Sequence, residues 1–148
     1  MLQYELVIDI DAPRERVVEL FLDRDQYRVW QPTLVRLEPG KGESGATGST
    51  ATVVHKMGPR EVPMHETVVD GSMPERYEVT YQAKKVFNRV THRFEALDDQ
   101  RTRLVYRTEF ELSGPMKLMA KLAPGMFKKQ SRDVLGRFKA FAESKARG

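Results

Sequence analysis

The three histidines, His55, His65 and His92, are the side chains whose charge changes nearest to neutral pH. Their spacing does not suit a metal site, because no two of them share one helical face and no acidic cluster accompanies them. Cysteine is absent, which excludes thiol chemistry, and no serine lies in a nucleophile-elbow pattern. We therefore expect no metal and no cofactor, and acid–base chemistry by a histidine is the reaction left to consider.

The strands on either side of His92 can be aligned by their charges. Alternating apolar residues predict strands over 87–97 and 101–112, and the short polar break between them favours an antiparallel hairpin. One register creates two opposite-charge pairs on the outer face, each worth about 0.2–1 kcal/mol. These pairs are Arg89 with Glu109 and Glu95 with Arg103.

The same register brings three polar side chains together on the inner face. His92 lies opposite Tyr106, and a strand at 76–83 places Tyr77 on the other side of His92. A buried imidazole needs hydrogen-bond partners, and both tyrosine hydroxyls can donate or accept. The row is therefore either a hydrogen-bonded core histidine or an acid–base site in which Tyr77 and Tyr106 help to move protons.

Glu66 is a second candidate, and the sequence leaves it open. On a strand at 62–70, one of two sets faces inward: Met64, Glu66 and Val68, or His65, Thr67 and Val69. An inward Glu66 would be a buried carboxylate with a raised pKa and hence a functional candidate. An outward Glu66 would be an ordinary solvated side chain.

The elements that position these residues follow from periodicity. Alternating residues from Tyr4 to Ile10 predict a first strand, and two short helices follow before Pro32. Later strands are expected at 34–38, 49–57, 62–70, 76–83, 87–97 and 101–112. After Gly114-Pro115 the period becomes helical, with a short helix at 115–122 and a long one at about 126–145.

This order of elements predicts one α+β domain over residues 1–148. A meander with one apolar face must be covered, and only the C-terminal helix is long enough to cover it. We expect a seven-stranded antiparallel sheet wrapped around that helix, with two short helices between strands 1 and 2. The helix should bury one stripe and expose another: Phe127, Val134, Phe138 and Phe141 inside, and Lys128, Arg132 and Lys139 outside.

Basic residues concentrate at the C-terminal end, where 113–148 carries nine basic and two acidic side chains. Because these cations alternate with the apolar stripe, a solvated helix face is favoured and no stable nucleic-acid complex is expected. Loops at 58–60, 84–86 and 113–115 should share one end of the sheet. Apolar and cationic residues meet there: Met57, Phe87, Met116, Met119, Arg60, Lys84, Lys85, Lys117 and Lys121.

That end suits an amphiphile with an anionic head, or at most transient contact with an anionic membrane. Ordinary lysine-rich loops would look the same. No apolar run reaches the ~18 residues that cross a bilayer, and no signal-peptide pattern opens the sequence. A cytoplasmic monomer or homodimer is therefore expected.

The stretch IDIDAPRERVVELFLDRDQYRVWQPTLV resembles the opening of START-like (SRPBCC) proteins, particularly their polyketide cyclase/dehydrase branch. The matching features are Ala12-Pro13, Asp23 or Asp25, Tyr27 and Trp30-Gln31-Pro32, and the C-terminal LGRFKAFAES resembles the closing helix of the family. The resemblance implies a helix-grip fold with a hydrophobic cavity. Members of such families bind lipids or other hydrophobes, cyclise aromatic polyketides, or regulate partners.

Three hypotheses follow: a carrier or sensor of a hydrophobic or amphiphilic small molecule, a cofactor-independent polyketide cyclase or aromatase, and a regulatory module whose basic helix contacts RNA or a protein. The catalytic candidates in the second are His92, Tyr77 and Tyr106. The residues expected to contact the ligand between sheet and helix are Trp30, Val79, Tyr81, Val90, Phe94, Thr108, Phe110, Phe127, Val134 and Phe138.

Overall fold

The computed structural model describes residues 1–147. The strands and helices occur in the expected order, including two short helical segments between the first two strands. They are β1 (Leu2–Ile10), α1 (Arg14–Leu22), η1 (Arg24–Gln26), α2 (Tyr27–Trp30), β2 (Leu34–Pro39), β3 (Thr50–Met57), β4 (Arg60–Asp70), β5 (Tyr77–Ala83), β6 (Val86–Asp98), β7 (Arg101–Leu112), α3 (Pro115–Leu122) and α4 (Gly125–Arg147).

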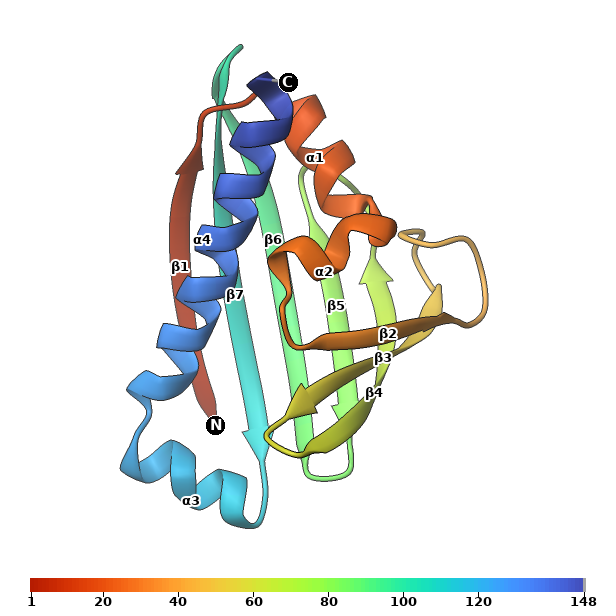
Figure 1. Ribbon diagram of the computed structural model, residues 1–148, viewed down its shortest axis with the longest axis vertical. Coiled ribbons are helices and arrows are strands. Elements are labelled where there is room, and N and C mark those ends of the chain that lie inside the picture. The colour runs from red at the N-terminus through yellow and green to blue at the C-terminus, as the bar shows by residue number, and fades with distance from the viewer. Residues whose placement is uncertain (148) are drawn as a thin grey trace.

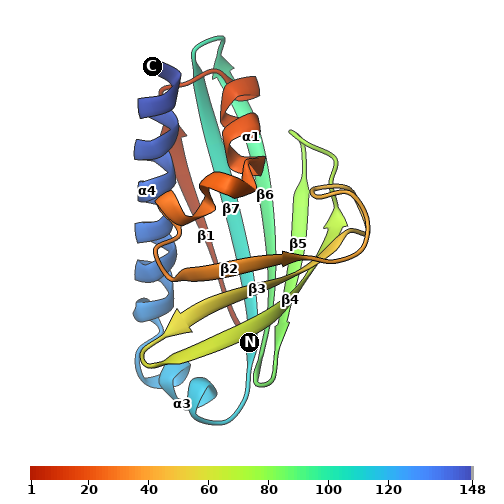
Figure 2. The ribbon, with the colours of Figure 1, turned by 45° about the vertical axis from the view of Figure 1, so that its right-hand side comes forward.

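The seven strands form one antiparallel sheet in the order β1-β7-β6-β5-β4-β3-β2. The first strand joins the sheet at the β7 edge, and every other pairing is between neighbours in sequence, as expected for a meander. The sheet curls around α4, which runs along its concave face beside β1 (Figures 1 and 2). The predicted register is confirmed: Tyr77 pairs with His92, and His92 pairs with Tyr106.

The outer-face ion pairs differ from those expected, although the register is right. Arg89 lies opposite Glu109 but reaches Glu78 on β5 at 3.5 Å, and Arg103 pairs with Asp9 on β1 at 2.8 Å. β6 and β7 each have a neighbouring strand on both sides, so a long arginine on either can choose between two carboxylates. Because exposed pairs are worth only about 0–1 kcal/mol, the choice costs little.

Helix α4 presents its apolar stripe to the sheet as predicted, with some differences at its edges. Phe138 and Phe141 are buried, whereas Phe127 and Val134 are only half-buried. Leu135, which the expected stripe omitted, is also buried, because an apolar face wider than one row of residues covers the sheet.

Two lysines of α4 are less exposed than predicted. Lys139 Nζ donates a hydrogen bond to the Asp9 carbonyl oxygen at 2.5 Å, which draws the side chain against β1. Lys128 is half-buried as well, while Arg132 is exposed as expected. Long cationic side chains can lay their methylene groups along apolar surface while the charge stays in water.

One end of the space between the sheet and α4 is filled by aromatic rings. Phe21 of α1 stacks on Trp30 of α2 at a centroid distance of 5.6 Å, and it meets Phe94 at 5.2 Å and Phe138 at 5.4 Å. These four rings join two helices, the sheet and α4. The short helices therefore close this end, which we call the closed end. The opposite end, where α3 and the β3–β4 and β5–β6 turns lie, is the open end (Figures 1 and 2).

Removing the ring of Phe138 should test this packing. Phe138 is 0% exposed, so Phe138→Ala leaves a cavity and should lower the free energy of unfolding by about 3–5 kcal/mol in urea melts. Phe127→Ala, at the half-buried start of the helix, should lower it less. A loss below about 1 kcal/mol for Phe138→Ala would show that the helix does not depend on this contact.

Candidate functional site

The row of Tyr77, His92 and Tyr106 exists on the inner face. Ring centroids lie 5.9 Å apart for Tyr77 and His92, and 5.4 Å apart for His92 and Tyr106. Three neighbouring strands, β5, β6 and β7, each supply one member because inward positions recur at every second residue.

The hydrogen bonding of His92 differs from the expectation. Its Nδ1 lies 3.1 Å from the backbone carbonyl oxygen of Tyr77, so Nδ1–H donates to the backbone and not to a tyrosine hydroxyl. The ring of Phe21 covers it at a centroid distance of 4.8 Å, and His92 is 6% exposed. Burial lowers the pKa of His92 to about 4, which the backbone hydrogen bond offsets only in part. His92 is therefore neutral at pH 7.

A second polar group, which the sequence reasoning missed, lies further toward the open end. The Tyr4 hydroxyl lies 2.6 Å from Ser131 Oγ and 3.0 Å from the backbone oxygen of Phe127, to which it donates. Burial raises the pKa of Tyr4 to about 12. Asn88 Nδ2 donates to Thr108 Oγ1 at 2.7 Å. Alternation along β1 places Tyr4 on the inner face. Once β1 is paired with β7, Tyr4 lies opposite Thr108, and this signal could have identified it.

Tyr106 stands between His92 and this polar group. Burial raises the pKa of its hydroxyl, and hydrogen bonds to Ser131 and Thr108 oppose the shift. Its side chain is nevertheless only half-buried. Around Tyr106 the inner face thus carries uncharged hydroxyls at pH 7, and these can orient a polar group of a ligand by hydrogen bonding.

Glu66 faces inward, which settles the question that the sequence left open. It is 4% exposed, and Arg24 Nη2 donates to its Oε1 at 2.8 Å. The guanidinium also lies over the Tyr27 ring, 5.6 Å from its centroid. His65 is exposed on the other face. Arg24 was not among the predicted residues, because nothing in its local sequence indicates that η1 reaches β4.

This buried ion pair ties the short helical segment to the far side of the sheet. Nearby, burial and the charge of Glu66 raise the pKa of Tyr77 to about 12, while Arg24 acts in the opposite direction. Within residues 1–147, Arg24 Nη1 and Trp30 Nε1 are buried without a hydrogen-bond partner. Removing either charge of the pair would leave the other buried and unpaired, so we assign it a structural role.

The residues expected to contact a ligand fall into two groups along the inner face. Six of them are packed into the core with almost no accessible surface: Trp30, Val79, Val90, Phe94, Thr108 and Phe138. The other four keep part of their surface: Tyr81, Phe110, Phe127 and Val134. Burial raises the pKa of Tyr81 well above its ordinary value even though its side chain retains accessible surface.

A hollow of about 330 Å³ opens where this half-buried surface meets α3. Phe110 lines it and also packs against Phe127 at a centroid distance of 5.4 Å. Apolar residues and two lysines complete the lining: Met1, Leu2, Leu112, Ala120, Lys117 and Lys121, with Glu111 at its edge. Of the residues that the sequence placed at this mouth, Lys117 and Lys121 line the hollow, whereas Phe87 lies on the outer face under Arg89. An apolar opening flanked by cations suits an amphiphile.

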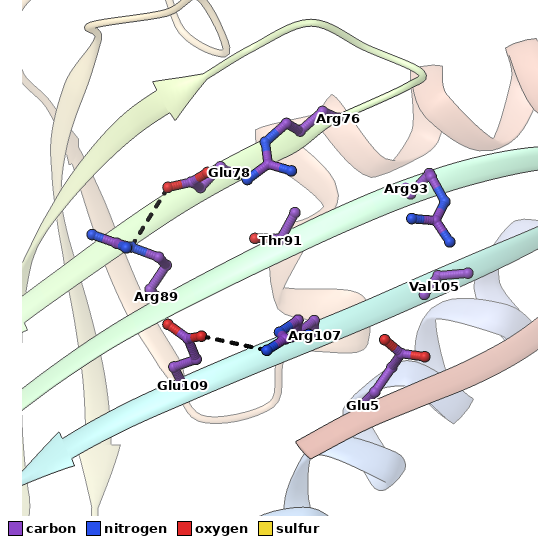
Figure 3. Close-up of a pocket in the computed structure, with 9 residues that line it drawn as sticks. All are labelled: Glu5, Arg76, Glu78, Arg89, Thr91, Arg93, Val105, Arg107 and Glu109. Atoms are coloured by element: carbon purple, nitrogen blue, oxygen red, sulfur yellow. Dashed lines mark hydrogen bonds and ion pairs between the residues drawn. The ribbon is translucent and has the colours of Figure 1, made fainter. Parts of the chain in front are cut away.

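Another hollow, of about 400 Å³, lies on the outer face and has a different character (Figure 3). Figure 3 shows Thr91 among arginines, with Arg89 directed toward Glu78 at 3.5 Å and Arg107 toward Glu109 at 3.8 Å. Four arginines that are about half exposed line it together with three glutamates, so it is a charged, solvated sheet face. We do not place an apolar ligand there.

The three histidines do not converge. His55 Nδ1 lies 2.8 Å from Thr33 Oγ1, far along the sheet from the row, and burial lowers the pKa of His55. Within the described residues, no group of three His, Cys, Asp or Glu side chains could hold a metal ion. None of the helices described in residues 1–147 is long and apolar enough to cross a membrane.

Comparison with known proteins shows which family the chain belongs to. The profile of the family described as "Polyketide cyclase / dehydrase and lipid transport" matches residues 1–143. The chain belongs to this family. No curated protein sequence matches it.

Solved structures share the helix-grip fold at low identity. An aromatase/cyclase, Zhui from Streptomyces sp. R1128, is 16% identical with a TM-score of 0.74, covering 95% of this chain and 93% of that one. A START superfamily protein from Mycobacterium smegmatis is 14% identical with a TM-score of 0.72, covering 95% and 99%. A conserved protein from Geobacillus kaustophilus is 16% identical with a TM-score of 0.79, covering 97% and 96%. Such likeness establishes the fold and leaves function to the site itself.

The buried state of His92 should appear as a pH dependence of stability. Its pKa is about 4 in the folded chain, below the ordinary 6.5, so the unfolded chain binds the proton more readily between these values. Burial of the neutral His92 therefore leaves the free energy of unfolding unreduced above pH 6.5, and this free energy decreases as the pH falls toward 4. Between pH 7 and pH 5 the wild type should lose about 2 kcal/mol more than His92→Gln in urea melts. The exposed His65→Gln should keep the wild-type slope; equal slopes for His92→Gln and wild type would show that His92 is accessible to protons.

Proposed function

We propose that this chain binds a hydrophobic or amphiphilic small molecule between the sheet and α4, as a carrier or sensor. The observation that carries the proposal is the half-buried aromatic surface of Tyr81, Tyr106, Phe110 and Phe127, which continues into the hollow at the open end. Phe21 and Trp30 fill the closed end, so a ligand would enter past α3. Membership of a family named for cyclases and lipid transport supports a ligand of this kind.

The polar groups on this surface fit one polar group on an otherwise apolar molecule. Tyr4, Ser131, Thr108 and Asn88 already form hydrogen bonds to protein atoms, and the hydroxyls and the amide can accept or donate further ones. Because the pKa of Tyr4 is about 12, its hydroxyl stays protonated at pH 7. A hydroxyl or carbonyl of the ligand would suit the interior, while an anionic head would suit the lysines outside.

The ten residues proposed to contact the ligand would then act in two ways. Tyr81, Phe110, Phe127 and Val134 would touch it first, because they keep accessible surface. The packed set (Trp30, Val79, Val90, Phe94, Thr108 and Phe138) would form the floor that limits how deep it reaches. Ligand size would therefore be set by the aromatic cluster and not by the length of the sheet.

Two phenylalanines offer a matched test of this site. Phe110 and Phe87 are both half-buried on neighbouring strands at the open end, but Phe110 faces α4 and Phe87 lies on the outer face under Arg89. Phe110→Ala should weaken binding of cis-parinaric acid at least about tenfold, because an apolar contact worth about 1.5–3 kcal/mol is lost. Phe87→Ala should leave the Kd unchanged.

Fluorescence titration measures both values, and native mass spectrometry of the wild type should reveal any hydrophobe that co-purifies. Equal Kd values for Phe110→Ala and wild type would place the ligand elsewhere, and absence of any binding would contradict the carrier role.

The alternative is a cofactor-independent cyclase or aromatase, favoured by the row of His92 between Tyr77 and Tyr106. Two features weigh against it: His92 is covered by Phe21, and its Nδ1–H is already donated to the backbone. In such an enzyme, positioning of a reactive polyketide would be the main contribution of the pocket.

His92→Gln separates the two functions. If His92 moves protons, turnover of a polyketide substrate should fall about 10²–10⁴-fold while binding survives. If the chain is a carrier, the Kd of the variant should stay near that of the wild type and no turnover should be lost. Kd and turnover measured on the same protein samples distinguish these outcomes.

A further inference from the structure

The open end carries an unusual concentration of exposed apolar side chains. Within residues 1–147, ten large hydrophobic residues are exposed, and six of them lie here: Met1, Met57, Leu118, Met119, Leu122 and Met126. Leu118 is 59% exposed and Leu122 77%, and no residue of α3 is buried. Scattered surface hydrophobics need no explanation, but a cluster of this kind marks an interaction surface.

Helix geometry sorts the side chains of α3 into stripes. Leu118 and Leu122 are four residues apart and lie on one face, with Met119 beside them. Lys117 and Lys121 form the adjacent stripe, at the edge of the hollow beside β1 and β7. The helix is thus amphipathic, and its apolar side points away from the chain to which it is attached.

Cations dominate the charge of α3 and of the start of α4. From Ser113 to Arg132 the chain has five cations (Lys117, Lys121, Lys128, Lys129 and Arg132) and no acidic residue. The β5–β6 turn adds Lys84 and Lys85, since the Ser113 N–H donates to the Lys85 carbonyl oxygen at 3.1 Å. Figures 1 and 2 show α3 and these turns at the same end of the molecule.

We infer that the open end, through α3 and the start of α4, docks on the surface of an anionic lipid bilayer. A bilayer interface accepts the leucines and methionines into its acyl boundary and attracts the lysines at its head groups. A nucleic acid would satisfy only the cations, and a second copy of this chain would bring like charges together. This inference stands independently of the small-molecule site, since it uses the outward face of α3.

Flotation of the full chain with vesicles tests the inference. The wild type should bind phosphatidylcholine vesicles that contain phosphatidylserine, and it should bind pure phosphatidylcholine vesicles at least about tenfold more weakly. Raising the salt from about 0.1 M to about 1 M shortens the screening length from about 10 Å to about 3 Å and should weaken binding further.

Variants identify the surface. Leu118→Asp with Leu122→Asp should weaken binding to the anionic vesicles at least about tenfold. Lys128→Gln with Lys129→Gln should also weaken binding to the anionic vesicles. The difference from the wild type should be smaller at high salt, because salt screens the lost charges. Val29→Asp with Leu97→Asp is the matched control, because both residues are exposed near the closed end. It should bind like the wild type, and urea melts should show that all variants fold.

Several results would overturn the inference. One is failure of the wild type to float with phosphatidylserine vesicles. Another is a leucine variant that floats as well as the control variant. Sedimentation equilibrium gives a third result that would overturn it. If the wild type dimerises but the leucine variant does not, and neither floats with vesicles, then the surface joins two copies of the chain. The lipid assignment would then be wrong. The dependence of wild-type binding on lipid composition and on salt is measured without any variant. This part of the test therefore holds even if a variant does not fold.

Discussion

The contacts of Phe21 are the interaction on which the rest of the structure depends. Its ring meets Trp30, Tyr77, His92, Phe94 and Phe138, and so connects α1 with α2, two central strands and α4. Aromatic rings bury a large apolar area in a rigid shape, and such pairs gain about 0.5–1.5 kcal/mol beyond that area. Because this cluster occupies one end of the curved sheet, the opposite end is the part of the inner face that stays accessible.

The same packing decides the chemistry of the inner face. An imidazole covered by Phe21 cannot keep a proton at pH 7, since burial disfavours the charged form. Tyr4 and Tyr77 shift in the other direction for the same reason, and both stay neutral. A surface of neutral hydroxyls and aromatic rings recognises shape and hydrogen bonds rather than charge. The ionised groups remain at the edges, where water solvates them, apart from the Arg24–Glu66 pair.

The charged residues differ in how freely they choose their partners, according to how deeply they are buried. On the outer face, the arginines and glutamates of neighbouring strands choose among several partners at little energetic cost. Glu66 has no such freedom, because it is buried on the inner face, where within residues 1–147 Arg24 is its ion-pair partner. That pair holds η1 against β4 and so helps to fix where Trp30, six residues later, joins the aromatic cluster. At the open end no acidic residue lies between Ser113 and Arg132, so cations dominate the charge there.

The sequence by itself determined the order of the six meander strands, the register around His92, the inward stripe of α4 and the break between α3 and α4, but not the edge that β1 joins. These follow from local periods of 2 and 3.6 residues and from turn residues, which depend on near neighbours. Only the tertiary structure decided that Glu66 faces inward to meet Arg24, that His92 bonds to the backbone, and that Tyr4 joins Ser131. Each of these contacts joins segments that are distant in sequence or turns on how rings pack, and side-chain periodicity carries no information about either.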